Sequence, residues 1–119
     1  MTSAAPESPS EWLPGVWRSD RERTVQAWGE HAPGSAEFKL ILLRDLGTLE
    51  VSYAAGISVS NFNGEKTSGE YRIVWQSSDQ AFVVSRNEDG ESGQHLFFEC
   101  PTVFWVHVGR FVEFFQKLR

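Results

Sequence analysis

The stretch Glu70–Gln76, EYRIVWQ, alternates in the way that a half-buried β-strand requires. Tyr71, Ile73 and Trp75 would face one side of the strand, and the residues between them would face the other. The same period of two continues from Thr48 onward. It predicts strands near Leu49–Ala54, Ser58–Phe62, Glu70–Gln76, Ala81–Arg86, Gln94–Cys100, Val103–Val108 and Phe111–Leu118.

Short connections rich in Gly, Asn, Asp and Ser separate these strands, for example at Asn63-Gly64. Such connections are typical of antiparallel hairpins, so consecutive strands should be neighbours in a meander. Several strands are apolar on both faces, which favours a strongly coiled sheet, and closing the sheet removes its exposed edges. We therefore expect a mostly antiparallel β-barrel of seven or eight strands.

The residues before Thr48 predict a strand followed by a helix. Val16-Trp17 begins the strand after a turn at Pro14-Gly15. The run Ser19–Glu22, SDRE, has the form of a capping box, in which a side chain at each end satisfies a free backbone N–H. It predicts a helix over roughly Asp20–Glu30.

A second helix is expected after the first. Ser35 can cap it and Gly47 can end it, although Phe38–Leu43 could instead form a buried strand. The fold class is then α+β, with two short helices after the first strand. Residues 1–11 are rich in Ser, Ala, Pro and Glu and predict a disordered tail, which leaves residues 12–119 as a single domain.

The composition restricts the partners and the compartment. The chain has 119 residues and a net charge of −5, which repels nucleic acid and anionic membranes, so neither is expected as a partner. Cys100 is the only cysteine, and its aromatic neighbours predict a buried, inert thiol. No apolar run approaches the ~20 residues of a membrane-spanning helix. We expect a cytoplasmic monomer or homodimer.

The order of the motifs suggests a family. The run Gly15–Asp20, GVWRSD, precedes the helix pair and the strands, and the last strand ends on aromatic and basic residues at Phe111–Lys117. This order resembles the calycins, which comprise the lipocalins and the intracellular fatty-acid-binding proteins. It is more closely similar to small bacterial lipocalin-like domains that begin G-x-W-x-S-D. The resemblance covers roughly Leu13–Arg119 and implies a small lipocalin-like barrel.

The resemblance also implies a barrel-closing motif. In calycins the motif Trp packs across the bottom of the barrel, and a basic side chain from the last strand lies over its indole. Gly15 and Trp17 match the start of this motif, and Lys117 is the best-aligned basic residue, with Arg119 and Arg110 as alternatives. Calycins normally have Arg at this place. A cation over an indole contributes about 0.5–1 kcal/mol when it is exposed.

A calycin barrel implies an interior cavity, so we expect non-enzymatic binding of a small hydrophobic ligand, fatty acid-like or similar, without a cofactor. Interior arginines hold a carboxylate in fatty-acid-binding proteins, but no motif aligns Arg72 or Arg86 with them, and both fit the surface. The candidate lining residues come from one alternating face of each strand. They are Tyr53, Phe62, Tyr71, Ile73, Trp75, Phe82, Val84, Leu96, Phe98 and Trp105.

An alternative function is protein–protein interaction, as in an inhibitor or immunity-type module. In that case the core would be filled and would support a contiguous exposed apolar patch. No nucleophile elbow, phosphate-binding loop or zinc-binding HExxH motif occurs, so no catalytic residues are assigned and an enzyme is not expected.

The titratable residues leave further alternatives. His31, His95 and His107 could lie on the polar face or could ligate haem or a metal, and no metal site is predicted. Glu99 or Glu113 would have a raised pKa if it pointed into an apolar interior, where it could select a polar ligand head. Either residue could equally face solvent.

Overall fold

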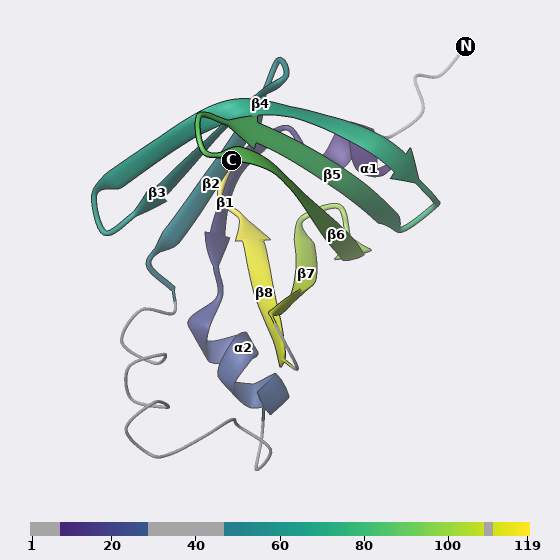
Figure 1. Ribbon diagram of the computed structural model, residues 1–119. Helices are drawn as coiled ribbons and strands as arrows, with labels where there is room; N and C mark the ends of the chain where they lie inside the picture. Colours follow the sequence, from purple (N-terminus) through teal and green to yellow (C-terminus); the bar gives the residue numbers. More distant parts are fainter. Residues whose placement is uncertain (1–7, 29–46, 109–110) are drawn as a thin grey trace.

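The structure is a computed structural model that describes residues 8–28, 47–108 and 111–119. Its strands form one closed antiparallel barrel in which each strand pairs with the next along the chain (Figure 1). This confirms the predicted antiparallel meander barrel. The elements are α1 (Pro9–Trp12), β1 (Gly15–Ser19), α2 (Arg21–Trp28), β2 (Leu49–Ala54), β3 (Ile57–Phe62), β4 (Glu65–Gln76), β5 (Gln80–Asn87), β6 (Gly90–Cys100), β7 (Val103–Val108) and β8 (Phe111–Lys117).

Two tight turns set the register of β2, β3 and β4. Ala55-Gly56 joins β2 to β3 with φ angles of 51° and 80°, and Asn63-Gly64 joins β3 to β4 with 52° and 88°. Positive φ at both central residues gives a turn whose twist matches that of the strands. β4 begins at Glu65, earlier than predicted. The prediction missed its first residues because they are polar and show no apolar alternation.

β1 closes the barrel between β2 and β8. Trp17 pairs with Val51 on one side and with Lys117 on the other. The backbone N–H of Leu118 donates to the Val16 carbonyl oxygen over 2.7 Å. Closure therefore satisfies the backbone groups that an edge strand would leave free.

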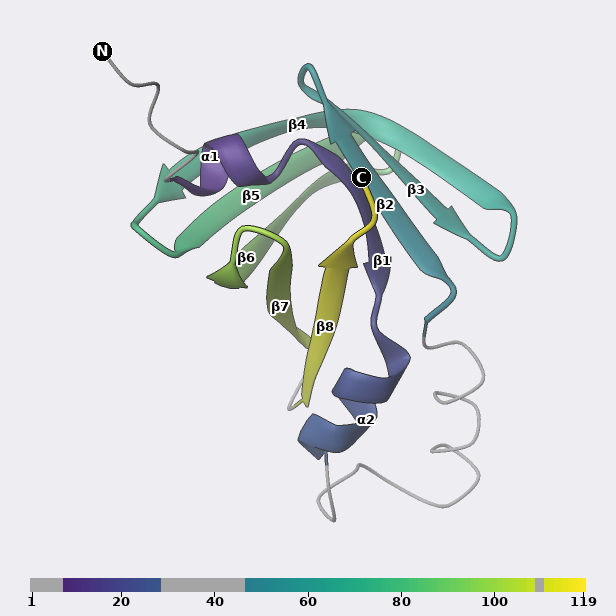
Figure 2. The same ribbon diagram turned by 180° about the vertical axis from the view of Figure 1, so that it is seen from behind.

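The core forms around Trp17 and the residues that follow α1. The Trp17 Nε1–H donates to the Leu13 carbonyl oxygen over 2.8 Å, and the indole lies 4.6 Å from the Phe104 ring between centroids. Figure 2 shows α1 beside β4 and β5, which it contacts. The buried core residues are Leu13, Trp17, Ala81, Val83, Leu96, Phe98, Phe104, Val106 and Phe115.

α1 corrects the predicted extent of the disordered tail. The prediction ran to Glu11, whereas Pro9–Trp12 is helical and Pro9 is buried. Proline suits the first turn of a helix, where its missing N–H has no intrahelical partner to lose. A four-residue helix shows no apolar period, so the sequence pattern did not reveal it. Residues 1–7 lie outside the described residues.

α2 confirms the first predicted helix but not its capping box. Asp20, rather than Ser19, accepts the backbone N–H of Arg23 on its Oδ1 over 3.1 Å. Ser19 is buried instead, because it occupies an inward position at the end of β1. The second predicted helix, and the alternative strand at Phe38–Leu43, lie outside the described residues apart from Gly47.

A candidate ligand-binding cavity

The barrel holds a cavity of about 300 Å³. Paired residues share a face, so Val51, Ser60 and Thr67 all point inward from β2, β3 and β4. One wall of the cavity is polar and crosses β3 to β6, with Ser58, Ser60, Thr67, Ser85, Ser92 and Gln94. The other wall is mainly apolar, with Leu49, Val51, Leu96, Phe104, Val106 and Phe115.

Glu113 interrupts the apolar wall. It lies on β8, where it pairs with Val106 of β7. The Ser19 hydroxyl donates to Glu113 Oε2 over 2.6 Å. Burial raises the pKa of the Glu113 carboxyl above its ordinary value, and the hydrogen bond from Ser19 opposes that rise. The carboxyl group that Glu113 brings to the cavity is therefore poorly solvated.

Tyr53 adds a polar group on β2. Its ring meets that of Tyr71 edge to face, with 4.9 Å between centroids. Burial, and secondarily the neighbouring Tyr71, raise the pKa of Tyr53 to about 12. At neutral pH Tyr53 is therefore an uncharged phenol that can donate or accept a hydrogen bond.

The predicted lining residues divide between the two faces. Strand pairing and contacts within the core place six of them on the inner face: Tyr53, Phe62, Tyr71, Ile73, Leu96 and Phe98. Tyr53 and Leu96 border the cavity itself, while Tyr71, Ile73 and Phe98 fill the core beside it. Phe62 lies at the far end of β3 and is 40% exposed.

Trp75 is on the outer face, which corrects the prediction that it shares a face with Ile73. The pairing with β5 shifts between these two residues: Ile73 pairs with Val83, and Trp75 pairs with Phe82. A bulge inserts one residue into the strand and so reverses the alternation after it. Trp75 is consequently 50% exposed.

Phe82, Val84 and Trp105 are also on the outer face, again against the prediction. On β5 the smaller Ala81 and Val83 are buried inside, and Phe82 and Val84 alternate with them. On β7 Trp105 pairs with Phe97 and alternates with buried neighbours. The prediction took one alternating face of each strand without knowing the register, whereas the pairing of β5 turns Ala81 and Val83 inward.

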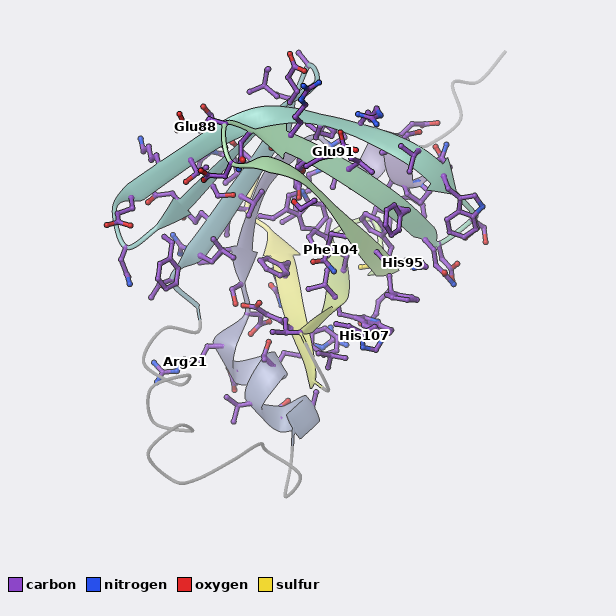
Figure 3. All side chains as sticks on the ribbon, viewed as in Figure 1. Arg21, Glu88, Glu91, His95, Phe104 and His107 are labelled. Atoms are coloured by element: carbon purple, nitrogen blue, oxygen red, sulfur yellow. The ribbon has the colours of Figure 1, made fainter. Side chains whose placement is uncertain are left out.

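Large rings that face outward form a continuous surface feature, the outer aromatic row. The ring of Phe97 stacks between His95 and Trp105, with centroids 4.2 Å apart on both sides. Figure 3 shows His95 and His107 outside the barrel and Phe104 inside it. The row consists of Trp75, Phe82, His95, Phe97, Trp105 and His107.

The histidines have structural neighbours in this row. His95 Nε2 lies 2.9 Å from Gln80 Oε1, and His107 contacts Trp105 edge to face. Among the residues that the structure describes, no group of three His, Cys, Asp or Glu side chains could hold a metal ion. His31 lies outside the described residues.

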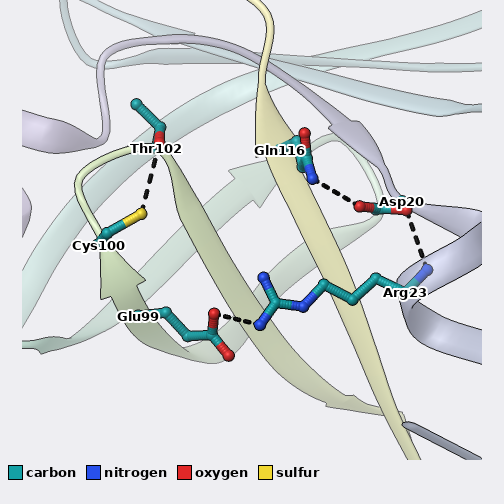
Figure 4. Close-up of polar contacts among 6 residues, drawn as sticks. All are labelled: Asp20, Arg23, Glu99, Cys100, Thr102 and Gln116. Carbon is teal, nitrogen blue, oxygen red and sulfur yellow. Dashed lines mark hydrogen bonds and ion pairs between the residues drawn. The ribbon is translucent and has the colours of Figure 1, made fainter. Parts of the chain in front are cut away.

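Of the charged candidates in the described ranges, Glu113 is the one that faces the cavity. Figure 4 shows Glu99 paired with Arg23 of α2. Arg72 lies 3.7 Å from Glu91 on the exposed surface. Arg86 borders the cavity, but its pairing with Glu70 places it on the outer face, because the adjacent pair, Tyr71 and Ser85, faces inward.

Cys100 is exposed, which corrects the expectation of a buried thiol. Its Sγ lies 3.4 Å from the Thr102 hydroxyl (Figure 4). This hydrogen bond, the largest influence, lowers the pKa of the Cys100 thiol. The bulge between Phe98 and Cys100 changes the alternation at the end of β6, which the aromatic neighbours in the sequence did not indicate.

Lys117 lies across Trp17 at the closure of the barrel. Its Nζ is 5.5 Å from the centroid of the indole and donates to the Trp12 carbonyl oxygen over 2.7 Å. Gly15 provides the space for this side chain, since a Cβ there would lie 2.6 Å from Lys117 Cε. Arg119 contributes its carbonyl oxygen, which accepts the Val16 N–H. Arg110 lies outside the described residues.

The polar wall was missed because the prediction selected apolar side chains only. Ser58 and Ser60 alternate along β3, and Ser92 and Gln94 alternate along β6. Two polar residues at this spacing on each of these strands were the available signal. The pattern could not distinguish a polar interior from a solvent-facing surface, since both alternate with period two.

The chain was also compared with known proteins. A scan against protein-family models gives no match. Searches of the curated proteins and of the solved structures give no significant match either. The calycin resemblance of the sequence therefore stays a prediction. No helix in the described ranges is long and apolar enough to cross a membrane.

We expect Glu113→Gln to gain stability relative to the natural protein as pH rises from about 4 to about 7. Because burial raises the pKa of Glu113, the folded protein binds more protons than the unfolded chain above the ordinary Glu pKa. The contribution of Glu113 to stability is thus fully present at low pH and is lost as pH rises through the folded pKa. Glutamine does not titrate.

Urea denaturation of both proteins across this range measures the effect. Subtracting the free energy of unfolding of one protein from that of the other cancels the pH-dependent contributions of the titratable groups that both proteins contain. A difference that stays constant as pH rises would show that Glu113 is well solvated, and one that moves against Gln would show that the fold stabilises its carboxylate; either result would contradict the prediction.

Proposed function

We propose that this chain is a non-enzymatic binding protein that takes a small ligand into the barrel cavity, as a lipocalin-like domain would. The observation that carries the proposal is the division of the cavity into a polar and an apolar wall. Hydroxyl and amide groups on β3 to β6 line the same space as the apolar side chains of Phe104 on β7 and Phe115 on β8. A ligand with an apolar body and a few polar groups matches both walls.

The size of the cavity limits the ligand. About 300 Å³ is at the lower end of the range for small-molecule sites and corresponds to roughly ten water volumes. A compact ligand fits this space, whereas a long acyl chain would have to extend beyond it. We therefore propose a compact ligand, in place of the long-chain fatty acid that the sequence-based expectation would allow.

Ser60→Phe tests the cavity as the binding site. Ser60 points inward from β3, so a phenyl ring there would fill the cavity, and we expect binding of a compact neutral probe, 2-phenylethanol, to fall at least about tenfold. Titration calorimetry measures the affinity, and native mass spectrometry of the purified protein detects a retained ligand.

Ser52→Phe is the matched control, because Ser52 lies on the outer face of β2 opposite Val59. It should bind the probe as the natural protein does. Equal binding by natural protein, Ser60→Phe and Ser52→Phe would place the probe elsewhere and would contradict the proposal.

The outer aromatic row favours a second candidate function, protein–protein interaction. It presents Trp75, which is 50% exposed, next to Val74, which is 51% exposed. Exposed apolar side chains that adjoin one another are typical of interfaces. Light scattering over a range of protein concentrations tests whether this face joins two copies.

A further inference from the structure

Glu113 restricts the chemistry of a ligand in the cavity. Its carboxyl group is contributed by the third residue of β8, Phe111–Lys117. Among the acidic residues described by the structure, it is the one that borders the cavity. A ligand that fills the space must therefore either interact with this carboxyl group or exclude water from it without replacing the lost hydrogen bonds.

The described residues leave the charge of Glu113 uncompensated. The hydrogen bond to Glu113 comes from the neutral hydroxyl of Ser19, and the ion pairs in these ranges join Arg18 to Glu50, Arg23 to Glu99 and Arg72 to Glu91. Burying an unpaired carboxylate is costly, and a cation within a few ångströms removes much of that cost. Burial raises the pKa of the Glu113 carboxyl group, and the hydrogen bond from Ser19 opposes that rise.

Aromatic rings border the same cavity as the carboxyl group. Phe104 and Phe115 both border the cavity and stack on each other, with 5.0 Å between centroids. Tyr53 borders it from β2. The face of an aromatic ring attracts a cation, and aromatic rings are used to recognise organic ammonium groups.

We infer that the cavity selects a small organic amine, whose ammonium group pairs with Glu113 while its apolar body lies against Phe104 and Phe115. This inference rests on the proposed function and names the ligand class for the same cavity. The polar wall would hydrogen-bond further donors or acceptors on such a ligand. A carboxylate ligand would instead meet a like charge at Glu113. Among the described arginines, Arg86 borders the cavity, and its strand pairing places it on the outer face.

Three probes of similar shape and different charge test the inference: phenethylamine, 2-phenylethanol and phenylacetate. Titration calorimetry at neutral pH gives each affinity. We expect the amine to bind at least about tenfold more tightly than the alcohol, and phenylacetate to bind most weakly. In Glu113→Gln the amine should lose at least about tenfold in affinity, whereas the alcohol should change little.

Glu99→Gln is the control variant, because Glu99 is exposed and lies outside the cavity. It should preserve the preference for the amine. If the alcohol binds but the amine has no advantage, or if the advantage survives in Glu113→Gln, the inference is wrong while the cavity proposal stands. If none of the probes binds to the natural protein, both fail. The comparison of probes on the natural protein holds even if Glu113→Gln does not fold.

Discussion

Trp17→Ala should lower the free energy of unfolding by about 3–5 kcal/mol, the usual cost of deleting a buried Trp side chain. Trp17 is fully buried. Its ring contacts Phe98 and Phe104, and Lys117 lies over its face. Alanine would remove these contacts, leave a void in the core, and free the Leu13 carbonyl oxygen that accepts the indole N–H. Urea denaturation followed by circular dichroism measures the loss.

Trp75→Ala is the matched control for this measurement. Trp75 is 50% exposed and contacts His95 edge to face on the outer aromatic row. We expect it to cost under about 1 kcal/mol, as for most surface substitutions. A loss at Trp17 as small as the loss at Trp75 would mean that Trp17 is not the centre of the core.

Gly69→Ala should destabilise the barrel by about 3 kcal/mol, the upper part of the usual range for overpacking. Gly69 lies on β4 and pairs with Ser58 of β3. A Cβ at this position would overlap the carbonyl oxygen of Arg86 and would lie 3.0 Å from its carbonyl carbon. Both atoms are backbone, so β5 would have to move away from β4. Glycine is retained in strands where another backbone approaches this closely.

Gly93→Ala separates this effect from the general cost of replacing a strand glycine. A Cβ at Gly93 would meet the Phe82 ring, with 2.6 Å to its Cζ, but a ring can rotate or shift. We expect a cost of about 1 kcal/mol. Thermal denaturation of both variants compares them, and equal costs would show that the barrel can relax around Gly69.

The sequence predicted the positions of the strands well, because period-two alternation and turn residues are local signals. The observed bounds of Leu49–Ala54 and Val103–Val108 match the predicted ones. The meander order followed from the short connections between strands. Polar strand ends, such as Glu65–Gly69, were missed because hydrogen bonding along a hairpin extends a strand without an apolar pattern.

The sequence predicted the inner face less well, because a face depends on register. One bulge after Ile73 moved Trp75 to the outside. On β5 the alternation was visible, but large outer rings such as Phe82 concealed which side was buried. Glu113 was one of two strand carboxylates that could have pointed inward, and only the pairing of β8 with β7 distinguishes it from Glu99.

The closure between β1 and β8 also bears on how the chain folds. Trp17 and Lys117, which are 100 positions apart (117 minus 17), must meet before the barrel closes. Contacts between distant positions form late, because the entropy of the intervening chain opposes them. When β8 pairs with β1, Glu113 and Phe115 reach the cavity, and Lys117 comes to lie over the Trp17 ring. A nascent chain with β8 still inside the ribosome would thus carry an open sheet without a cavity, so closure and the capacity to bind a ligand arise in one late step.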